Sequence, residues 1–137
     1  MTSWLLLLGS NRNGEAHVRE AVLKLVALGA VRALTPIRAF VADGDGQGEF
    51  HNTLVQIDQA PDRQTLEPLL KSIEDAMGRD RTDANAVVID IDILASGDGH
   101  SWQPDRHALN KGEFRRASVQ ALLAQAEIDI ELPKQHG

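Results

Sequence analysis

The segment from Val87 to Leu94 constrains the fold most, because it is dominated by β-branched residues that favour strands. Two aspartates, Asp90 and Asp92, interrupt this apolar run at positions i and i+2. Side chains of a strand alternate between its two faces, so both carboxylates project from one face and the isoleucines of the run project from the other. The segment therefore predicts a strand with one apolar face and one acidic face.

The two carboxylates on this apolar strand could have a chemical role. Two negative charges this close repel each other, and a hard cation such as Mg²⁺ relieves that repulsion. Asp90 and Asp92 are therefore candidate metal ligands. The alternative is an antiparallel strand with one wet face, because ordinary alternation produces the same pattern. Both interpretations remain open at this point.

Composition narrows the class of protein. A chain of 137 residues has the length of one domain, and we expect a single domain over residues 1–137. The net charge of −6 argues against nucleic acid as a partner, because binding to its phosphates needs a basic face. The chain has no cysteine, which excludes disulfides and thiolate metal sites. The apolar run Trp4–Leu8 is too short to cross a bilayer and has no basic leader, so we expect a cytoplasmic protein that does not bind membranes.

Apolar periodicity divides the chain into alternating strands and helices. The expected strands are residues 3–8, 31–41, 50–57 and 87–94, and the expected helices begin near residue 15 and residue 66 and end near residues 28 and 77. The order βαββαβ is that of the ferredoxin-like sandwich, an antiparallel sheet with both helices on one face. We therefore expect an α+β fold of this type. A C-terminal helix at about 113–126 would be added, and residues 128–132 could form an extra strand.

Three local features refine this expectation. Pro36 either confines the second strand to an edge or bends it. Pro68 would be the third residue of a helix capped by Thr65, a position where no intrahelical donor is lost. The glycine-rich residues 43–48 form the segment expected to be most flexible, and they resemble the front half of a calcium loop. Leu54 stands where the bidentate glutamate should be, which excludes an EF-hand.

Four short motifs follow one another in a fixed order. They are Leu-Gly-Ser-Asn at residues 8–11, Phe-x-Asn at 50–52, Ile-Glu-x-x-x-Gly-Arg-x-Arg at 73–81 and Ile-Asp-Ile-Asp-Ile-Leu at 89–94. In this order and at nearly this spacing, they resemble the 6-hydroxymethyl-7,8-dihydropterin pyrophosphokinase (HPPK) family of folate biosynthesis. The resemblance implies a ferredoxin-like fold and transfer of pyrophosphate from ATP to the hydroxymethyl group of a pterin. It also implies two Mg²⁺ ions as cofactors.

The resemblance also implies site residues. The implied catalytic residues are Asp90, Asp92, Arg79 and Arg81, with the two aspartates as metal ligands; the pterin-binding residues are Asn52, Phe50 and Phe114; the nucleotide-binding residues are Glu74, Lys71, Ile93 and His107. Stacking of a flat heterocycle between two aromatic rings adds roughly 0.5–1.5 kcal/mol per pair beyond burial. The alternatives are core packing for the two phenylalanines and loop salt bridges to Asp80 or Asp83 for the two arginines.

The chain departs from the family on the phosphate side. Where the family usually has Arg-Trp-Gly-Pro-Arg-Thr, this chain has residues 83–88, which lack arginine and tryptophan. The stretch between Gly-Arg and the aspartates is also about two residues shorter than is usual for the family. In the tail, the family's Pro-His and Arg-x-Phe become Arg106-His107 and Gly112-Glu113-Phe114. An arginine that stabilises transferring phosphoryl charge can contribute a factor of ~10³ or more to the rate. The pterin side is therefore expected to be better preserved than the phosphate side.

Three functions remain at this stage. The first is the family reaction, with a pterin and ATP as small-molecule partners and a monomer or weak dimer as the assembly. The second is an impaired or repurposed relative that still binds a pterin or a related heterocycle. The third is a ferredoxin-like interaction module in which the aspartates form only a wet face.

Overall fold

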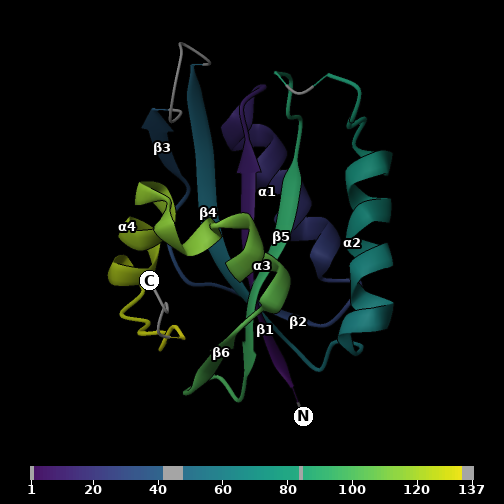
Figure 1. The fold of residues 1–137 in the computed structure, drawn as a ribbon. Helices are drawn as coiled ribbons and strands as arrows, with labels where there is room; N and C mark the ends of the chain where they lie inside the picture. The colour runs from purple at the N-terminus through teal and green to yellow at the C-terminus, as the bar shows by residue number, and fades with distance from the viewer. Residues whose placement is uncertain (1, 42–47, 84, 134–137) are drawn as a thin grey trace.

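The computed structural model describes residues 2–41, 48–83 and 85–133 (Figure 1). The strands are β1 (Ser3–Ser10), β2 (Ala30–Ala33), β3 (Arg38–Val41), β4 (Glu49–Asp58), β5 (Asp90–Gly97) and β6 (Trp102–Pro104). The helices are α1 (Gly14–Leu25), α2 (Arg63–Ala76), α3 (Arg106–Lys111), the 3₁₀ turn η1 (Glu113–Arg115) and α4 (Ala117–Gln125). Of the expected flexible segment, residues 43–47 lie outside the described residues.

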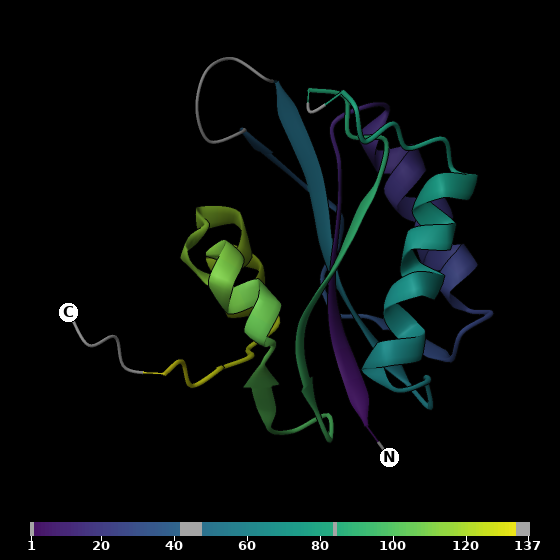
Figure 2. The ribbon, with the colours of Figure 1, turned by 45° about the vertical axis from the view of Figure 1, so that its right-hand side comes forward.

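The strands form an antiparallel sheet in the order β2-β4-β1-β5-β6, with β3 also paired to β4. Helices α1 and α2 cover one face, and α3, η1 and α4 cover the other (Figure 2). The predicted α+β fold with an antiparallel sheet is confirmed. The C-terminal helices add a third layer to the expected two-layer sandwich.

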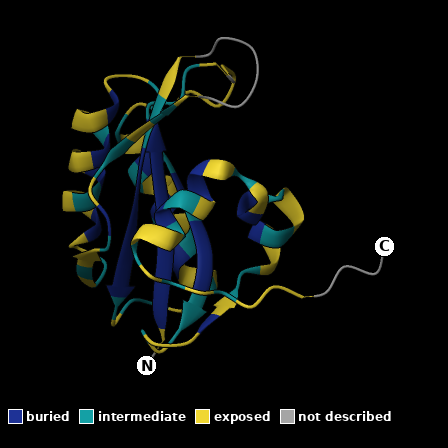
Figure 3. Cartoon of the chain, turned by 90° about the vertical axis from the view of Figure 1, so that its left-hand side faces the viewer, coloured by how far each residue is buried: buried dark blue, intermediate teal, exposed yellow. Residues whose placement is uncertain are grey.

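The central strand β1 explains why the chain begins with such an apolar run. All eight of its residues are buried. Leu6 and Leu8 pack toward α1 and α2, whereas Leu5 and Leu7 pack toward the C-terminal helices. A strand covered on both faces needs apolar side chains on both. Figure 3 shows the same division, with buried strands inside and exposed turns on the outer sides of the helices.

The expected second strand is two strands. Both β2 and β3 pair with β4, and the chain between them passes through Thr35 and Pro36. Thr35 is buried at this break, where its hydroxyl oxygen accepts the backbone N–H of Leu54 at 3.1 Å. The Thr53 hydroxyl donates to the Thr35 carbonyl at 2.9 Å. These bonds bridge the break at Pro36, so the proline divides the expected strand into two parts that both stay at the edge of the sheet, paired with β4.

The start of α2 differs from the prediction. Asp62, not Thr65, is the N-cap, because its carboxylate accepts the backbone N–H of Thr65 at 2.9 Å. Pro68 is consequently the sixth helical residue instead of the third, and the helix continues past it to Ala76. Aspartate is among the strongest N-cap residues, which explains why the helix begins earlier.

The C-terminal region is also more divided than predicted. Asp105 caps the short helix α3, and Gly112, with φ of 74°, ends it. Arg116 has extended backbone angles and separates η1 from α4, so the expected helix at 113–126 is interrupted. Residues 128–132 do not form a strand; Ile128 and Ile130 instead pack half-buried against the core on the α4 side.

Candidate functional site

The site begins at the free edge of β5. Strand β6 pairs with β5 only at residues 95–97, so the first half of β5 is not paired on that side. Helix α2 covers this edge: Glu74 Oε2 accepts the backbone N–H of Ile91 at 2.7 Å. Arg79 Nη1 donates to the Ile89 carbonyl at 3.3 Å. Two side chains therefore satisfy backbone groups that an edge strand leaves unpaired, and they fix the end of α2 beside the aspartates.

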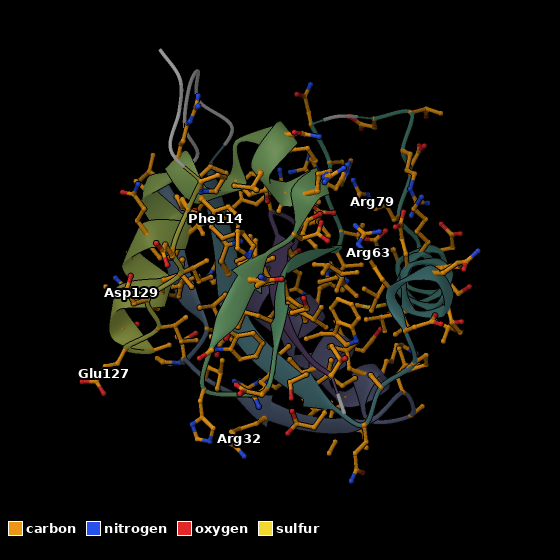
Figure 4. The ribbon with its side chains drawn as sticks, turned by 60° about the horizontal axis from the view of Figure 1, so that its bottom comes forward. Arg32, Arg63, Arg79, Phe114, Glu127 and Asp129 are labelled. Atoms are coloured by element: carbon orange, nitrogen blue, oxygen red, sulfur yellow. The ribbon has the colours of Figure 1, made fainter. Side chains whose placement is uncertain are left out.

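A cavity of about 280 Å³ lies between α2, β5 and α3. The predicted site residues that line it are Lys71, Glu74, Arg79, Arg81, Asp90, Asp92, Ile93 and His107, and they are joined by Arg63, Glu67, Lys111 and Glu113, which the sequence did not single out. Figure 4 shows Arg63 and Arg79 on the side of α2, with Phe114 on the opposite flank near the C-terminal helices. The structure therefore gathers the expected metal-binding, phosphate-binding and nucleotide-binding residues in one place.

The two aspartates stand on one face of β5. In the register with β1, Asp90 pairs with Gly9 and Asp92 pairs with Leu7. Their side chains point toward the layer of α3 and α4 and keep 33% and 18% of their surface exposed. The two carboxylates are therefore mostly buried, and the interpretation of a solvent-exposed polar face does not describe Asp92.

Burial and mutual repulsion shape the charge of this pair. Burial, together with the negative charge of Asp90, raises the pKa of Asp92 to about 8. Burial acts in the same direction on Asp90, but hydrogen bonds from Asp92 and from the Arg79 guanidinium outweigh it and lower the Asp90 pKa. Two adjacent carboxyl groups that cannot both ionise easily form a favourable site for a divalent cation, whose charge removes the conflict.

The donor set fits Mg²⁺ held by few protein ligands. Within residues 2–41, 48–83 and 85–133, no three His, Asp or Glu side chains converge closely enough to hold a metal ion by themselves. Mg²⁺ is often bound by one or two carboxylates and completed by water and substrate phosphate oxygens. The pair Asp90 and Asp92 matches this arrangement.

The arginines near the pair are held by acidic side chains. Arg79 Nη1 lies 2.8 Å from Asp90 Oδ1 and 3.3 Å from Glu74 Oε2. Arg81 Nη2 lies 2.6 Å from Glu74 Oε1, and its Nη1 pairs with Asp75. The loop salt bridges to Asp80 or Asp83 that the sequence allowed are not the ones in the structure. Glu74 orients both arginines toward the cavity.

The sequence analysis did not predict two basic residues of the cavity, Lys111 and Arg63. Lys111 Nζ lies 3.6 Å from Asp92 Oδ1. Arg63 is bound by Asp105 at 2.7 Å and by Glu67 at 2.5 Å. The spacing of Arg63 and Glu67 by four residues on one helix was the available signal for that pair. For Lys111, the only signal was its position three residues before Phe114.

Asn52 lies on β4, which flanks β1 on the side opposite to β5, and its side chain projects from the same face of the sheet as the two aspartates. It pairs in register with Gly9, and a Cβ at Gly9 would lie 2.5 Å from its Nδ2 atom. The amide Nδ2 donates to the Leu8 carbonyl at 3.3 Å. Asn52 is 2% exposed, and its Oδ1 has no hydrogen-bond partner within the described part of the chain. A buried unpaired oxygen costs about 1–3 kcal/mol, so it marks a position for a donor from a ligand.

The two predicted aromatic residues lie on this face but do not line the cavity. Phe50 is half-buried on β4, two residues before Asn52, and pairs in register with Phe40 of β3. Phe114 is 6% exposed and packs in the core with Leu122 and Trp102. The residues expected for the pterin and those expected for the phosphates therefore occupy neighbouring regions, and the cavity described above lies in the second region. Phe40, which the sequence reasoning missed, belongs to the first region.

The rest of the Leu-Gly-Ser-Asn motif anchors the segment that leads into β5. Asn11 Oδ1 accepts the backbone N–H of Val87 at 2.7 Å, and the backbone N–H of Asn11 donates to the Val87 carbonyl at 2.9 Å. Asn11 Nδ2 donates to the Asn85 carbonyl at 2.9 Å. The motif thereby fixes where β5 begins, and so where Asp90 and Asp92 stand.

Together these features define an α+β protein of the ferredoxin-like type, with a cavity lined by both acidic and basic side chains at the free edge of β5. The model of the family described as 7,8-dihydro-6-hydroxymethylpterin-pyrophosphokinase (HPPK) matches residues 5–136. Because this match spans nearly the whole chain, the protein belongs to the HPPK family. A search of curated proteins found no significant match. Among the helices described, none is long and apolar enough to span a membrane.

Proposed function

We propose that the protein catalyses the reaction of its family, the transfer of pyrophosphate from ATP to 6-hydroxymethyl-7,8-dihydropterin. The observation that carries this proposal is the arrangement around Gly9. Asp90 and Asn52 flank this glycine on neighbouring strands, so the carboxylates and the unpaired amide oxygen share one face of the sheet. Two strand spacings separate them by about 10 Å. A pterin bound at Asn52 would extend its hydroxymethyl group toward a triphosphate bound at the aspartates.

The pterin would be held by shape and hydrogen bonding. Its ring N–H and amino groups are donors suited to the unpaired Oδ1 of Asn52. Phe50 and Phe114 lie on the same face and are the proposed stacking partners for the flat heterocycle. These contacts form equally in the ground state and the transition state, so they supply affinity and orientation more than rate.

The triphosphate would occupy the cavity. Asp90 and Asp92 would hold Mg²⁺, which supplies charge neutralisation on the phosphate oxygens when it is bound. Arg79 and Arg81 would contact the phosphates, and Glu74, Lys71, Ile93 and His107 would line the nucleotide site. The pterin hydroxyl oxygen forms a bond to the β-phosphorus while the bond from that phosphorus to the α,β-bridging oxygen breaks. AMP leaves with the electron pair, and the hydroxyl proton passes to water.

The direct test measures AMP and pterin pyrophosphate after incubation with Mg²⁺, ATP and the hydroxymethyl pterin. We expect both products in equal amounts, and we expect neither when Asp92→Asn replaces the native protein. AMP formation that does not depend on the pterin, or no AMP at all from a protein that binds both ligands, would overturn the proposal.

A second candidate function has its own supporting observation. Residues 83–88 contain no arginine or tryptophan, and Arg79 and Arg81 are both occupied by carboxylates. These features are compatible with a protein of this family that binds a pterin but does not transfer pyrophosphate. Titration separates the candidates: the enzyme binds the pterin and Mg·ATP, the non-catalytic relative binds only the pterin, and an interaction module binds neither.

All proposed ligands are small molecules, and the chemistry needs only one domain of this size. We therefore also propose that the 137 residues act as one domain, as a monomer or a weak dimer, in the cytoplasm, where ATP is available.

A further inference from the structure

Lys111 occupies a distinctive place at the cavity. It is the last residue of α3, immediately before Gly112, where the φ of 74° turns the chain away. Its ammonium group lies 3.6 Å from Asp92 Oδ1, and 44% of its side chain remains exposed. The end of a short helix thereby holds a flexible cation at the rim of the cavity, beside the aspartate pair.

The three arginines of the cavity make shorter and more numerous ion pairs than Lys111 does. Arg63, Arg79 and Arg81 are each bound by two carboxylates, at distances that include 2.8 Å or less for every one of them. Lys71 pairs with Glu67 on its own helix and not with the aspartates. Among the cavity cations that the structure describes, Lys111 is the one whose charge faces Asp92 through a single long contact.

We propose that Lys111 is a catalytic residue that binds an oxygen of the transferring β-phosphoryl group of ATP. The inference rests on the proposed function. In the free protein, the lysine partly neutralises Asp92. A metal ion held by the aspartates would repel the ammonium group, which would then be drawn to the negative charge of the bound triphosphate. Lysine suits this exchange, because its ammonium is a compact charge with three donors on a flexible stem.

This arrangement predicts two effects of opposite sign. Removal of the lysine charge makes the aspartate pair more negative, so Mg²⁺ alone should bind roughly 3-fold to 10-fold more tightly. The same change removes a phosphate contact, so Mg²⁺ with a nucleotide should bind about 10-fold more weakly. Loss of one preorganised donor to developing charge typically lowers kcat by on the order of 100-fold. A lysine that only stabilised the fold would not produce opposite changes in these two affinities.

The test compares the native protein with Lys111→Met, Lys111→Arg and the control Lys24→Met. Lys24 is exposed on α1, away from the cavity, and its replacement removes the same charge. Calorimetry measures binding of Mg²⁺ alone, then of Mg²⁺ with α,β-methylene-ATP, in which the bond to be cleaved is blocked. Assays of AMP formation measure kcat, a pterin titration measures pterin affinity, and thermal unfolding checks the fold.

We expect opposite affinity changes and a lower kcat for Lys111→Met, with pterin affinity within about 2-fold of native. Lys111→Arg keeps the charge and should retain analogue binding, and Lys24→Met should match the native protein. Unchanged values for Lys111→Met, or a decrease of both affinities together, would overturn the role of Lys111 while the native activity still supports the proposed function. If the native protein itself neither binds the analogue nor forms AMP, the proposed function fails, and this inference fails with it.

Discussion

Glu74 on α2 and Ile91 on β5 are joined by a hydrogen bond of 2.7 Å from the Ile91 backbone N–H to the Glu74 carboxylate. The Glu74 side chain is 6% exposed and also binds Arg79 and Arg81. Burial raises the pKa of Glu74, and the hydrogen bond from Ile91 opposes that rise. One carboxylate therefore connects the helix, the strand that carries the aspartates and both phosphate-side arginines.

The first prediction concerns stability. Glu74→Ala leaves the Ile91 N–H without its acceptor and removes one of the two carboxylate partners of each arginine, and we expect a loss of about 3 kcal/mol in the free energy of unfolding. Glu74→Gln keeps an acceptor for the N–H and should lose only about 1–2 kcal/mol. Urea denaturation measures both. The control is Glu15→Ala, which breaks an exposed pair with Arg19 and should cost less than about 1 kcal/mol. Equal losses for Glu74→Ala and Glu15→Ala would contradict the connecting role.

The second prediction concerns the unpaired oxygen of Asn52. Asn52→Ala removes the proposed pterin acceptor, so we expect pterin affinity to fall by about 10-fold to 100-fold, or roughly 1.4–2.8 kcal/mol. Stability should fall by only about 1 kcal/mol, because removal of the unpaired Oδ1 partly offsets the loss of the long hydrogen bond from Nδ2 to the Leu8 carbonyl. Fluorescence titration with the pterin and urea denaturation test the two halves. Pterin affinity equal to that of the native protein would remove Asn52 from the site.

The third prediction uses Gly9, which lies between Asp90 and Asn52. A methyl group at this position would lie 2.5 Å from the Asn52 amide, so Gly9→Ala must push that side chain aside. The side chain end can move at modest cost, and we therefore expect a larger loss of pterin affinity than of stability. The comparison is Ala21→Gly on α1, which affects stability alone. A Gly9→Ala protein with native pterin affinity would show that the amide position is unimportant.

The fourth prediction gives the aspartate pair a pH dependence. Without metal, an acid whose folded pKa is raised costs stability above its unfolded pKa of about 3.9, and the cost grows until the pH reaches the folded value. For Asp92, that window extends to a pH of about 8. Asp92→Asn should therefore stabilise the metal-free protein by at least about 1 kcal/mol at pH 8 and by much less at pH 4. The same variant should lose Mg²⁺-dependent nucleotide binding.

Urea denaturation with a chelator at the two pH values measures the difference in stability, and calorimetry measures binding of Mg·ATP. Asp58→Asn is a suitable comparison, because hydrogen bonds from Gln56 and Ser3 lower the pKa of Asp58. Its charge adds stability that is lost as the pH falls, so this variant should be destabilised at pH 8. If the stability of the Asp92→Asn protein varies with pH as in the native protein, and its Mg·ATP affinity is native, then the two carboxylates do not repel each other as proposed.

The strands around the site could be predicted because their signals are local. The alternation in β5 placed Asp90 and Asp92 on one face, and the apolar run of β1 predicted a strand at residues 3–8. The meeting of Asp90 with Asn52 at Gly9 depends on strand order, which spacing along the chain does not contain. Family resemblance, not periodicity, suggested that these residues act together.

The C-terminal half of the site could not be predicted from periodicity for a related reason, and His107 and Phe114 were expected there only from the family resemblance. Helix α3 has only six residues, too few for a clear apolar period, and Asp105 both caps it and binds Arg63 of α2 at 2.7 Å. That ion pair between distant segments brings Lys111 and His107 to the cavity. Contacts of this kind become visible only when the packing of α3 against β5 and α2 is known.

The last prediction concerns the rate. Residues 83–88 lack the arginine and tryptophan that the family usually places before the aspartates, so we expect transition-state contacts to be missing while the proposed pterin contacts remain. Loss of contacts made only in the transition state lowers kcat more than it weakens binding. We expect pterin affinity within about 10-fold, or ~1.4 kcal/mol, of a family member that has the complete loop, and a kcat reduced far more than that. Steady-state kinetics of the two proteins, measured side by side, provide the comparison. A kcat on the order of 1 s⁻¹ or faster would contradict the prediction and would indicate that Arg79, Arg81, Arg115 or Arg116 supplies the missing charge from another direction.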